Sequence, residues 1–264
     1  MGKYSGILIC SDFDGTLYDG KQIPENNMQA IRELREGGGF FTVVSGRTSE
    51  FLRDFFGEYK LGVPTVNYNG AVIYDLDNDI VVSESFIGGL TAELAKRCLA
   101  VSKSAINAIF CPPNKTIRIP VGSPELITQE LCDNTYKYLI ELPLDVSKEA
   151  SEEDFKAIKE IVGDEYALVR SSHHLIELLD KRFTKASASL FLKEYTGAHT
   201  LICVGDFEND LDMIKAADIG YAVANAAESV KAAADRVTVS VKEGAIAAIM
   251  DDIKSGICKQ NITI

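Results

Sequence analysis

An apolar run that leads directly into a pair of carboxylates constrains this chain more than any other feature. Residues 6–11, Gly-Ile-Leu-Ile-Cys-Ser, are typical of a parallel strand buried on both faces, and Asp12 and Asp14 follow at its end. In open α/β sheets, ligands bind in the crevice beyond the carboxyl ends of such strands. We therefore expect a binding or catalytic site where this strand ends.

The spacing of the two acids favours a division of chemical work. One carboxylate can attack or bind a metal, while the other, held by the tight turn that Gly15 permits, transfers protons. Two nearby carboxylates repel each other unless a cation lies between them, so a divalent metal is expected. An Asp-x-Asp turn also occurs in glycosyltransferases, calcium loops and solvated turns, so the pair alone leaves several functions open.

A second strand, predicted over residues 40–44, ends in Ser45, Gly46 and Arg47. The hydroxyl group and the backbone N–H groups of this turn could hold a phosphate oxygen. Taken alone, such a segment is more often a plain turn followed by a surface charge.

A third segment places a lysine at the start of a helix. Thr184 is the expected N-cap and Gly197 the expected end, which puts Lys185 in the first helical turn. A cation at this end of the helix dipole is unfavourable unless an anion lies opposite. The alternative is a solvated lysine.

A fourth segment follows the apolar strand predicted over residues 200–204. Asp206 at the strand end can bind Mg²⁺, Asn209 can donate to a phosphate oxygen, and Asp210 can orient the other groups. Capping of the next helix by an acidic residue is the simpler alternative.

In their order and spacing these four segments resemble the haloacid dehalogenase superfamily, in particular its Cof-type branch, subclass IIB. The resemblance implies an α/β fold with a Rossmann-like parallel-sheet core, made of residues 1–83 and 181–264, and an inserted α+β type-II (C2) cap, residues 84–180. The positions that match the family's motifs are Asp12, Asp14, Ser45, Lys185, Asp206 and Asp210. One departure is Ala186, where the family often has glycine after the lysine.

The resemblance implies a Mg²⁺-dependent phosphatase that hydrolyses small phosphorylated metabolites, first of all sugar phosphates, through an aspartyl-phosphate. Asp12 would be the nucleophile and Asp14 the acid and then the base, with Ser45 and Lys185 spreading the negative charge. Metal ligation is expected from Asp12, the Asp14 carbonyl, Asp206 and Asp210. Further expected contacts to the phosphate or its loop come from Thr16, Gly46, Arg47 and Asn209.

Other functions on the same fold are compared by their residues. A dehalogenase has less need of Asp14, Asp206 and Asp210, and a P-type ATPase would carry long apolar spans. A phosphomutase keeps both aspartates and is the alternative enzyme. A binding or regulatory protein without turnover is the alternative of another class.

Composition limits partners and location. The net charge of −12 and the lack of a basic run argue against nucleic-acid or anionic-membrane binding. The six cysteines show no C-x-x-C spacing, and the chain has no apolar run long enough for a signal peptide or a membrane span, so a soluble, cytoplasmic protein with reduced thiols is expected. The oligomeric state stays undetermined.

Substrate choice is expected to depend on the cap, where the sequence says least. Flavin mononucleotide, pyridoxal phosphate and nucleotides stay open beside sugar phosphates. The cap residues that could face the site are Lys115, Arg118, Arg170, His173 and His174. For each of these residues, an ordinary solvated position is the alternative.

Overall fold

A parallel sheet forms the centre of the molecule in the computed structural model, which describes residues 2–256. Its five strands lie in the order β13-β12-β11-β1-β2, and all neighbouring pairs are parallel. The strands are β1 (Ile7–Ser11), β2 (Phe40–Val43), β11 (Thr200–Gly205), β12 (Ile219–Ala222) and β13 (Arg236–Val237).

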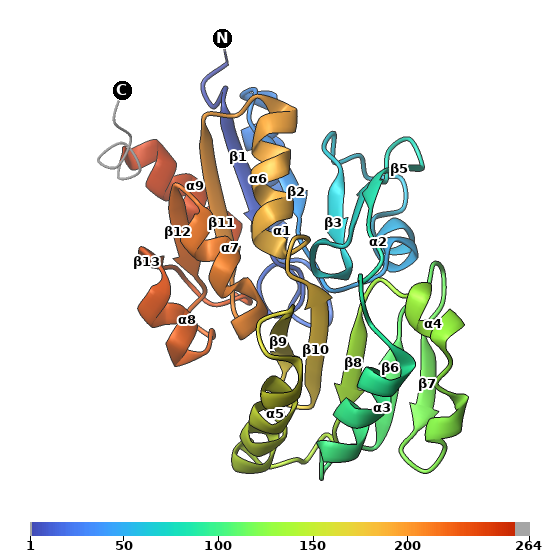
Figure 1. Ribbon diagram of the computed structural model, residues 1–264. Helices are drawn as coiled ribbons and strands as arrows, with labels where there is room; N and C mark the ends of the chain where they lie inside the picture. The colour runs from blue at the N-terminus through green and yellow to red at the C-terminus, as the bar shows by residue number, and fades with distance from the viewer. Residues whose placement is uncertain (1, 257–264) are drawn as a thin grey trace.

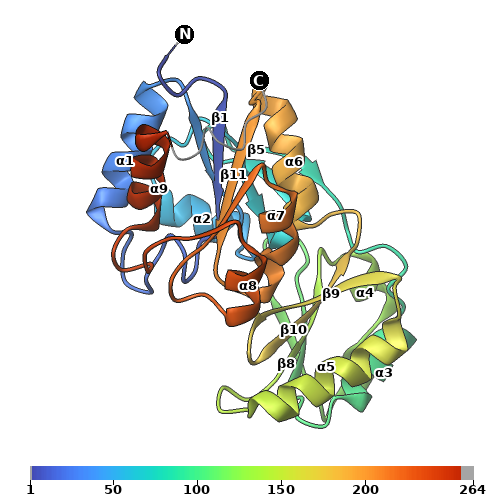
Figure 2. The same cartoon turned by 90° about the vertical axis from the view of Figure 1, so that its left-hand side faces the viewer.

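Helices cover both faces of this sheet (Figures 1 and 2). Side chains alternate along a strand, so Ile9 packs with α1 and α9 while Leu8 and Cys10 pack with α6 and α7. This three-layer arrangement confirms the predicted α/β fold. The helices of the core are α1 (Glu25–Glu36), α2 (Ser49–Phe56), α6 (Lys185–Thr196), α7 (Leu211–Ala216), α8 (Glu228–Ala233) and α9 (Ala245–Ser255). Among residues 2–256, no helix is long and apolar enough to cross a membrane.

A small antiparallel sheet extends the core beside β2. A parallel bridge between Val44 and Val66 joins it to the end of β2. Its second and third strands form an antiparallel hairpin. The strands are β3 (Thr65–Asn67), β4 (Val72–Asp75) and β5 (Ile80–Glu84), with the 3₁₀ turn η1 (Tyr68–Gly70) between the first two.

A second sheet, antiparallel and five-stranded in the order β7-β6-β8-β10-β9, lies across the end of the core (Figure 1). Apolar runs in the sequence predict four of these strands, near residues 105–110, 116–121, 166–169 and 175–179, but not β8. The sequence also predicts a helix near Leu126, where the structure has only a 3₁₀ turn, η2 (Pro124–Leu126). The strands are β6 (Asn107–Phe110), β7 (Ile117–Pro120), β8 (Tyr138–Glu141), β9 (Tyr166–Ser172) and β10 (Leu175–Asp180).

The two faces of this second sheet pack against different parts of the molecule. Phe110, Tyr138 and Ile140 pack with residues of the helices that cover this sheet. Those helices lie on the side of the sheet away from the core (Figure 2). The alternate residues Ile109 and Leu139 pack instead against core residues of η1 and β4. The second sheet therefore turns one face toward the carboxyl edge of the core sheet. Its helices are α3 (Ala92–Val101), α4 (Gln129–Asp133) and α5 (Lys148–Val162).

Candidate active site

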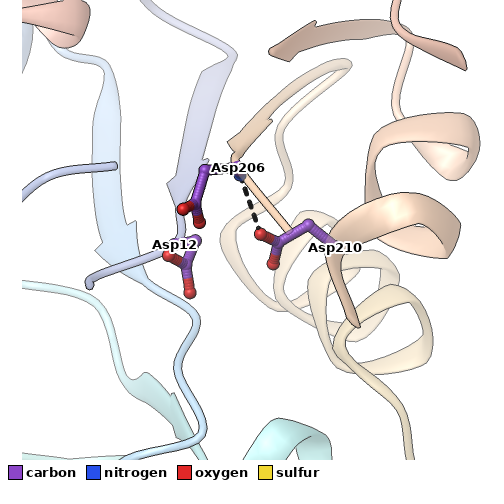
Figure 3. A group of neighbouring side chains, drawn as sticks. All are labelled: Asp12, Asp206 and Asp210. Atoms are coloured by element: carbon purple, nitrogen blue, oxygen red, sulfur yellow. Dashed lines mark hydrogen bonds between the residues drawn. The ribbon is translucent and has the colours of Figure 1, made fainter. Parts of the chain in front are cut away.

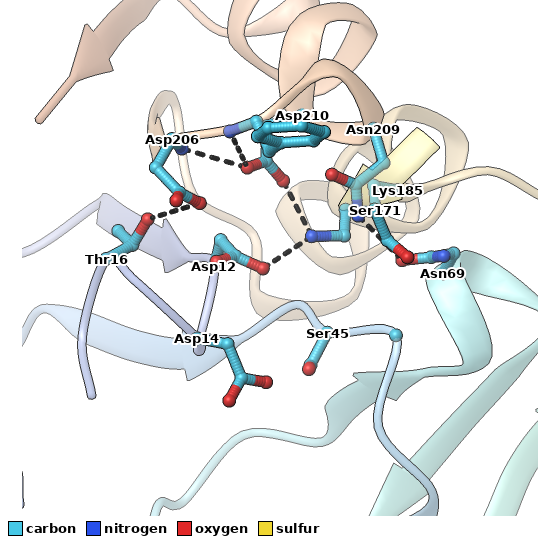
Figure 4. Close-up of polar contacts among 12 residues, drawn as sticks. Asp12, Asp14, Thr16, Ser45, Asn69, Ser171, Lys185, Asp206, Asn209 and Asp210 are labelled. Carbon is cyan, nitrogen blue, oxygen red and sulfur yellow. Dashed lines mark hydrogen bonds and ion pairs between the residues drawn. The ribbon is translucent and has the colours of Figure 1, made fainter. Parts of the chain in front are cut away.

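The ends of three core strands bring the predicted residues together. Asp12 follows β1, Ser45 follows β2 and Asp206 follows β11, and parallel strands end at the same edge of a sheet. Backbone bonds extend the strands into the site, because the Asp12 N–H donates to Val204 O at 2.9 Å and the Ser45 N–H donates to Val66 O at 2.8 Å. Figure 4 shows these side chains facing one another.

Lys185 lies at the centre of this group. The helix that carries it begins with a capping box, in which the Thr184 hydroxyl accepts from the Ser187 N–H and the Ser187 hydroxyl accepts from the Thr184 N–H. The lysine is 2% exposed, and its Nζ lies 2.6 Å from Asp12 Oδ1 and 2.6 Å from Asp210 Oδ1. The anionic partner expected opposite the helix start is thus a pair of carboxylates.

The charges of this cluster shift one another. Burial raises the pKa of Asp12 well above its usual value, and Asp210 adds to this effect while Lys185 opposes it. Burial acts against the Lys185 cation, yet Asp12 and Asp210 outweigh it and raise the lysine's pKa. One cation among several buried carboxylates leaves the site short of positive charge.

The acid group has the composition of a site for a divalent cation (Figure 3). Carboxylate oxygens of Asp12, Asp206 and Asp210 lie within 4.8 Å of one another. Asp12 Oδ2 is buried and has no hydrogen-bond partner among the described residues, and Asp206 Oδ1 accepts only a 3.3 Å bond from the Thr16 hydroxyl. Mg²⁺ prefers such oxygens, so Asp12 and Asp206 fit a metal.

Asp210 has a different position in the group. Its Oδ1 accepts from Lys185, and its Oδ2 accepts from the backbone N–H groups of Asp206 at 3.0 Å and Phe207 at 3.2 Å. Both oxygens are therefore already in use. We infer that Asp210 fixes the lysine and the turn after β11, and that Asp12 and Asp206 offer the oxygens available to a cation.

Gly15 explains how Asp12 and Asp14 fit beside Asp206. Its φ of +83° lies in the region that favours glycine, and a Cβ there would lie 2.4 Å from Asp206 Oδ2. The Asn225 side chain donates to Gly15 O at 2.8 Å and holds the turn. Only a residue without a side chain leaves room for the acid from β11.

Asp14 is bound to Arg47. The guanidinium donates to the carboxylate through Nε at 2.7 Å and Nη2 at 2.8 Å, and it lies 4.4 Å above the Phe51 ring. The Arg47 N–H also donates to Ser45 Oγ at 3.1 Å. The structure thus places both residues at the site, where they pair with each other.

The second sheet covers the site, and this sheet with its helices α3, α4 and α5 is called the cap below. Between the two sheets lies a cavity of about 410 Å³. Its core walls include every predicted catalytic residue except Lys185, which is buried behind Asp12, and its cap wall consists of β8 and β10 with the end of β9. The cap residues that line it are Lys137, Leu139, Ser171, Ser172, His174, Leu175 and Glu177.

A buried charged pair in this roof binds to the core. Glu177, 1% exposed, accepts from Lys137 Nζ at 2.7 Å, from the Ser171 hydroxyl, and from Asn69 Nδ2 of the core at 2.8 Å. Lys137 also donates to Gly46 O at 3.2 Å. The sequence analysis missed both members of this pair, although the alternation of residues along β10 places Glu177 on the same face as Leu175.

Asn209, which the sequence predicts as a phosphate contact, is joined to the hydrogen bonds around Glu177. The Asn209 amide, expected to face phosphate, lines the cavity and donates to Asn69 Oδ1 at 3.3 Å. At the end of β1, Thr16 donates to Asp206, and Gly15 O accepts from Asn225. The site is thus built from four separate segments of the core.

The five cap residues that were predicted as substrate contacts lie in different places. His174 lines the active-site cavity, and Arg118 lines a cavity beside it. Lys115 lines neither of these cavities. Arg170 instead joins the cap to the core through Glu208 at 2.7 and 2.9 Å, and the His173 ring packs edge-on against Phe207, 5.7 Å between centroids.

Comparison with known proteins decides the family. A model of haloacid dehalogenase-like hydrolases matches residues 9–250. The chain belongs to this family. The assignment confirms the resemblance that the four motifs indicated.

Several relatives are named as phosphatases. Two from Bacillus subtilis are 5-amino-6-(5-phospho-D-ribitylamino)uracil phosphatases: YitU is 26% identical over 262 residues, 93% of this chain and 96% of YitU. YcsE is 28% identical over 246 residues, 92% of this chain and 94% of YcsE. The predicted enzyme class, a phosphatase of this superfamily, is confirmed. The fold matches the subclass IIB sugar phosphatase BT4131 with a TM-score of 0.71 at 20% identity, over 94% of this chain and 98% of that one.

We predict that Glu177→Gln lowers the free energy of unfolding by about 3 kcal/mol, because Lys137 then stays buried without a counter-charge. Urea denaturation measures the change. The double variant Glu177→Gln with Lys137→Met should recover part of the loss. Glu153→Gln, an exposed position on α5, is the control and should leave stability unchanged. Equal stability of the Glu177 and Glu153 variants would contradict the role of the pair.

We predict that Mg²⁺ binding strengthens as the pH rises toward 7. Burial, with Asp210 second, raises the pKa of Asp206 to about 7, so the metal-free folded state holds a proton that the unfolded state releases near pH 4. Stability of the metal-free protein therefore falls as the pH rises through this window, and Mg²⁺, which displaces the proton, offsets the fall.

Thermal unfolding with and without Mg²⁺, at about pH 5.5 and about pH 7.5, measures this effect. The rise in Tm with Mg²⁺ should be larger at the higher pH. Asp206→Asn should remove most of that rise. A Mg²⁺ effect of the same size at both pH values would contradict the assignment of Asp206 to the metal.

Proposed function

We propose that this protein is a Mg²⁺-dependent phosphatase that hydrolyses small phosphorylated metabolites through an aspartyl-phosphate. One observation carries the proposal: Asp12 lines the cavity, one of its oxygens is held by Lys185, and the other is buried with no hydrogen-bond partner among residues 2–256. A carboxylate held in this way is oriented for attack on phosphorus. Residues 1–83 and 181–264 would form the catalytic core and residues 84–180 the cap.

In the first step an Asp12 oxygen forms a bond to phosphorus and the bond from phosphorus to the substrate's alcohol oxygen breaks. Asp14, two residues along the same turn, gives the leaving oxygen its proton. Lys185 and the Ser45 hydroxyl offset the charge on the phosphoryl oxygens. The product of this step is the free alcohol and phosphorylated Asp12.

In the second step water attacks the same phosphorus, and Asp14 accepts the water proton. The bond between phosphorus and the Asp12 oxygen breaks, which releases phosphate and restores the carboxylate. The backbone around Gly46 and the Asn209 amide lie on the cavity wall, where they can bind phosphoryl oxygens. Closure by the cap sheet limits this step to a few water molecules.

Asp14 must leave Arg47 to transfer protons. An incoming phosphate offers the guanidinium an alternative anion, because arginine forms similar paired bonds to carboxylate and phosphate. We propose that substrate draws Arg47 to the phosphate and frees Asp14. Arg47 would then belong to the phosphate site, as the sequence analysis expected.

Mg²⁺ would be held by Asp12, the Asp14 carbonyl and Asp206, with Asp210 fixing their surroundings. When bound, it supplies charge stabilisation for the phosphoryl oxygens. The surplus of buried carboxylates over Lys185 and the partnerless Asp12 Oδ2 support this proposal.

The substrate would be a sugar phosphate or a related small phosphorylated metabolite of the cytoplasm. Nucleic acids and membranes would not be partners of this protein. Polar cap side chains such as Ser171, Ser172 and His174 line the cavity and suit hydroxyl groups. The names of YitU and YcsE describe a phosphorylated ribityl chain on a uracil ring. A compound of that kind is therefore one candidate.

We predict that Asp12→Asn lowers phosphate release by at least about a thousandfold, because the amide keeps the shape of the carboxylate but is a poor nucleophile. Release is measured over a panel of phosphorylated metabolites, with and without Mg²⁺. Asp54→Asn, at an exposed position, is the control and should be fully active. Substantial turnover by the Asp12 variant would contradict the covalent route, and no release by the unaltered protein would favour a phosphomutase.

We predict that Asp14→Asn separates the two steps. With p-nitrophenyl phosphate, whose leaving group needs no proton, the variant should still phosphorylate Asp12 but hydrolyse the product slowly. Intact-protein mass spectrometry should then show accumulated phosphoenzyme. With alkyl phosphates both steps should be slow. Rapid turnover of alkyl phosphates would show that another group transfers the protons.

A further inference from the structure

Asn69 lies where the cap meets the loops that carry the reacting groups. Its backbone N–H donates to Ser45 O at 2.9 Å, and its amide covers Gly46, where an added Cβ would lie 3.1 Å from Asn69 Oδ1. The next residue, Gly70, is so close to the start of α6 that a Cβ there would lie 2.4 Å from the Thr184 carbonyl carbon. Asn69 is 1% exposed, and its φ of +58° is a conformation that asparagine tolerates. The residue is therefore fixed between two loops of the site.

The hydrogen bonds of the Asn69 side chain have a defined direction. Its Nδ2 donates to Glu177 Oε2 at 2.8 Å, and its Oδ1 accepts from Asn209 Nδ2 at 3.3 Å. A carboxylate bonded to a lysine offers acceptors only, whereas an amide can turn either end toward a neighbour. Glu177 therefore decides which end of the Asn69 amide faces the cap and which end faces Asn209.

Glu177 is held from within the cap. Lys137 Nζ donates to its Oε2 at 2.7 Å, and the Ser171 hydroxyl donates to its Oε1. Both carboxylate oxygens are thus oriented by partners on the cap's own strands and loops. The orientation of Glu177 does not depend on Asn69, so the direction of control runs from the cap carboxylate to the core amide.

Asn69 sets the orientation of Asn209 in the same way. Because Asn69 turns its oxygen toward Asn209, the latter must present its amide nitrogen, and Figure 4 shows the two amides facing each other. An amide nitrogen carries two N–H groups, and among the described residues Asn209 Nδ2 donates to Asn69 alone. Asn209 lines the active-site cavity, so its second N–H is available to a phosphoryl oxygen. With Asn69 reversed, an oxygen would take the place of this donor.

We propose that Glu177 is a positioning residue of the phosphatase: it fixes the Asn69 amide and, through it, sets the Asn209 amide nitrogen to bind the phosphoryl group. This inference rests on the proposed function and adds to it a cap residue that acts through two core side chains. The contacts from Glu177 through Asn69 to Asn209 are called the amide relay below. The relay crosses from cap to core, so the phosphate site is complete only while the cap lies on the core.

A double-mutant cycle tests the relay. Glu177→Gln puts a group that can donate or accept where the carboxylate was, so Asn69 loses its fixed direction. This variant should lower kcat/KM for p-nitrophenyl phosphate by about tenfold and weaken inhibition by inorganic phosphate by a similar factor. Asn209→Ala should have the same two effects. Asn78→Ala, at the exposed turn between β4 and β5, is the control and should change neither value.

The combined variant decides how Glu177 acts. Glu177→Gln with Asn209→Ala should lower kcat/KM by no more than about twentyfold, because both changes remove the same donor. A loss of about a hundredfold, the product of the separate effects, is expected if Glu177 acts on stability or on substrate directly, and it would overturn the proposal. Full activity of Asn209→Ala would overturn it as well.

Exchanging the two side chains gives a second test. Asn69→Asp alone places two carboxylates in contact and should lower kcat/KM by at least about tenfold. With Glu177→Gln added, the carboxylate at position 69 again offers Asn209 acceptors only, and the amide at position 177 can donate to it. The double variant should be at least about fivefold more active than either single variant, and Asn209→Ala should abolish this gain. No gain, or a gain that persists without Asn209, would overturn the relay.

Circular dichroism at the assay temperature shows whether each variant is folded. If Glu177→Gln alone is unfolded, the charge-free variant Lys137→Met with Glu177→Gln replaces it in the cycle. Phosphate release without coupling between positions 177 and 209 would overturn this inference and leave the phosphatase function standing. No release by the unaltered protein, from p-nitrophenyl phosphate or from the panel of metabolites, would overturn the proposed function and this inference together.

Discussion

The ion pairs of Lys185 with Asp12 and Asp210 are the interaction on which the site depends. They join the end of β1, the start of α6 and the turn after β11, which are remote in sequence. A buried charge without its partner costs several kcal/mol, so each of these groups needs the others. The pairs also fix which oxygens stay free: both Asp210 oxygens accept hydrogen bonds, whereas Asp12 keeps one buried oxygen, Oδ2, with no hydrogen-bond partner among the described residues.

Much of the core site could be predicted from sequence because it follows from strand ends. A long buried parallel strand is visible as an apolar run, and parallel strands end at one edge whatever their distance in the chain. The sequence alone could therefore predict that Asp12, Ser45 and Asp206 lie close together. The pairing of Asp14 with Arg47 could not, since it depends on the side-chain conformations of two half-exposed residues.

The cap could be predicted less well for a physical reason. Its strand β8 contains the short run Tyr138-Leu-Ile-Glu141, and so short an apolar run does not distinguish strand from helix. Without β8 at the centre of the sheet, Lys137 and Leu139 have no place in the roof, and Glu177 has no visible partner. Arg170 and His173 could be mistaken for substrate contacts because their partners, Glu208 and Phe207, belong to the distant core.

The alternation of the cap strands has a consequence for how this enzyme can evolve. Residues such as Phe110 and Tyr138 pack with α3 and α5, while their immediate neighbours Ile109 and Leu139 line a cavity between cap and core and pack against η1 and β4. Mutations at Ile109 and Leu139 therefore change the contact between cap and core without weakening the packing of α3 and α5. The residues proposed to react with phosphate lie on another part of the chain altogether, so under the proposed function substrate preference can change while the chemistry is inherited unchanged.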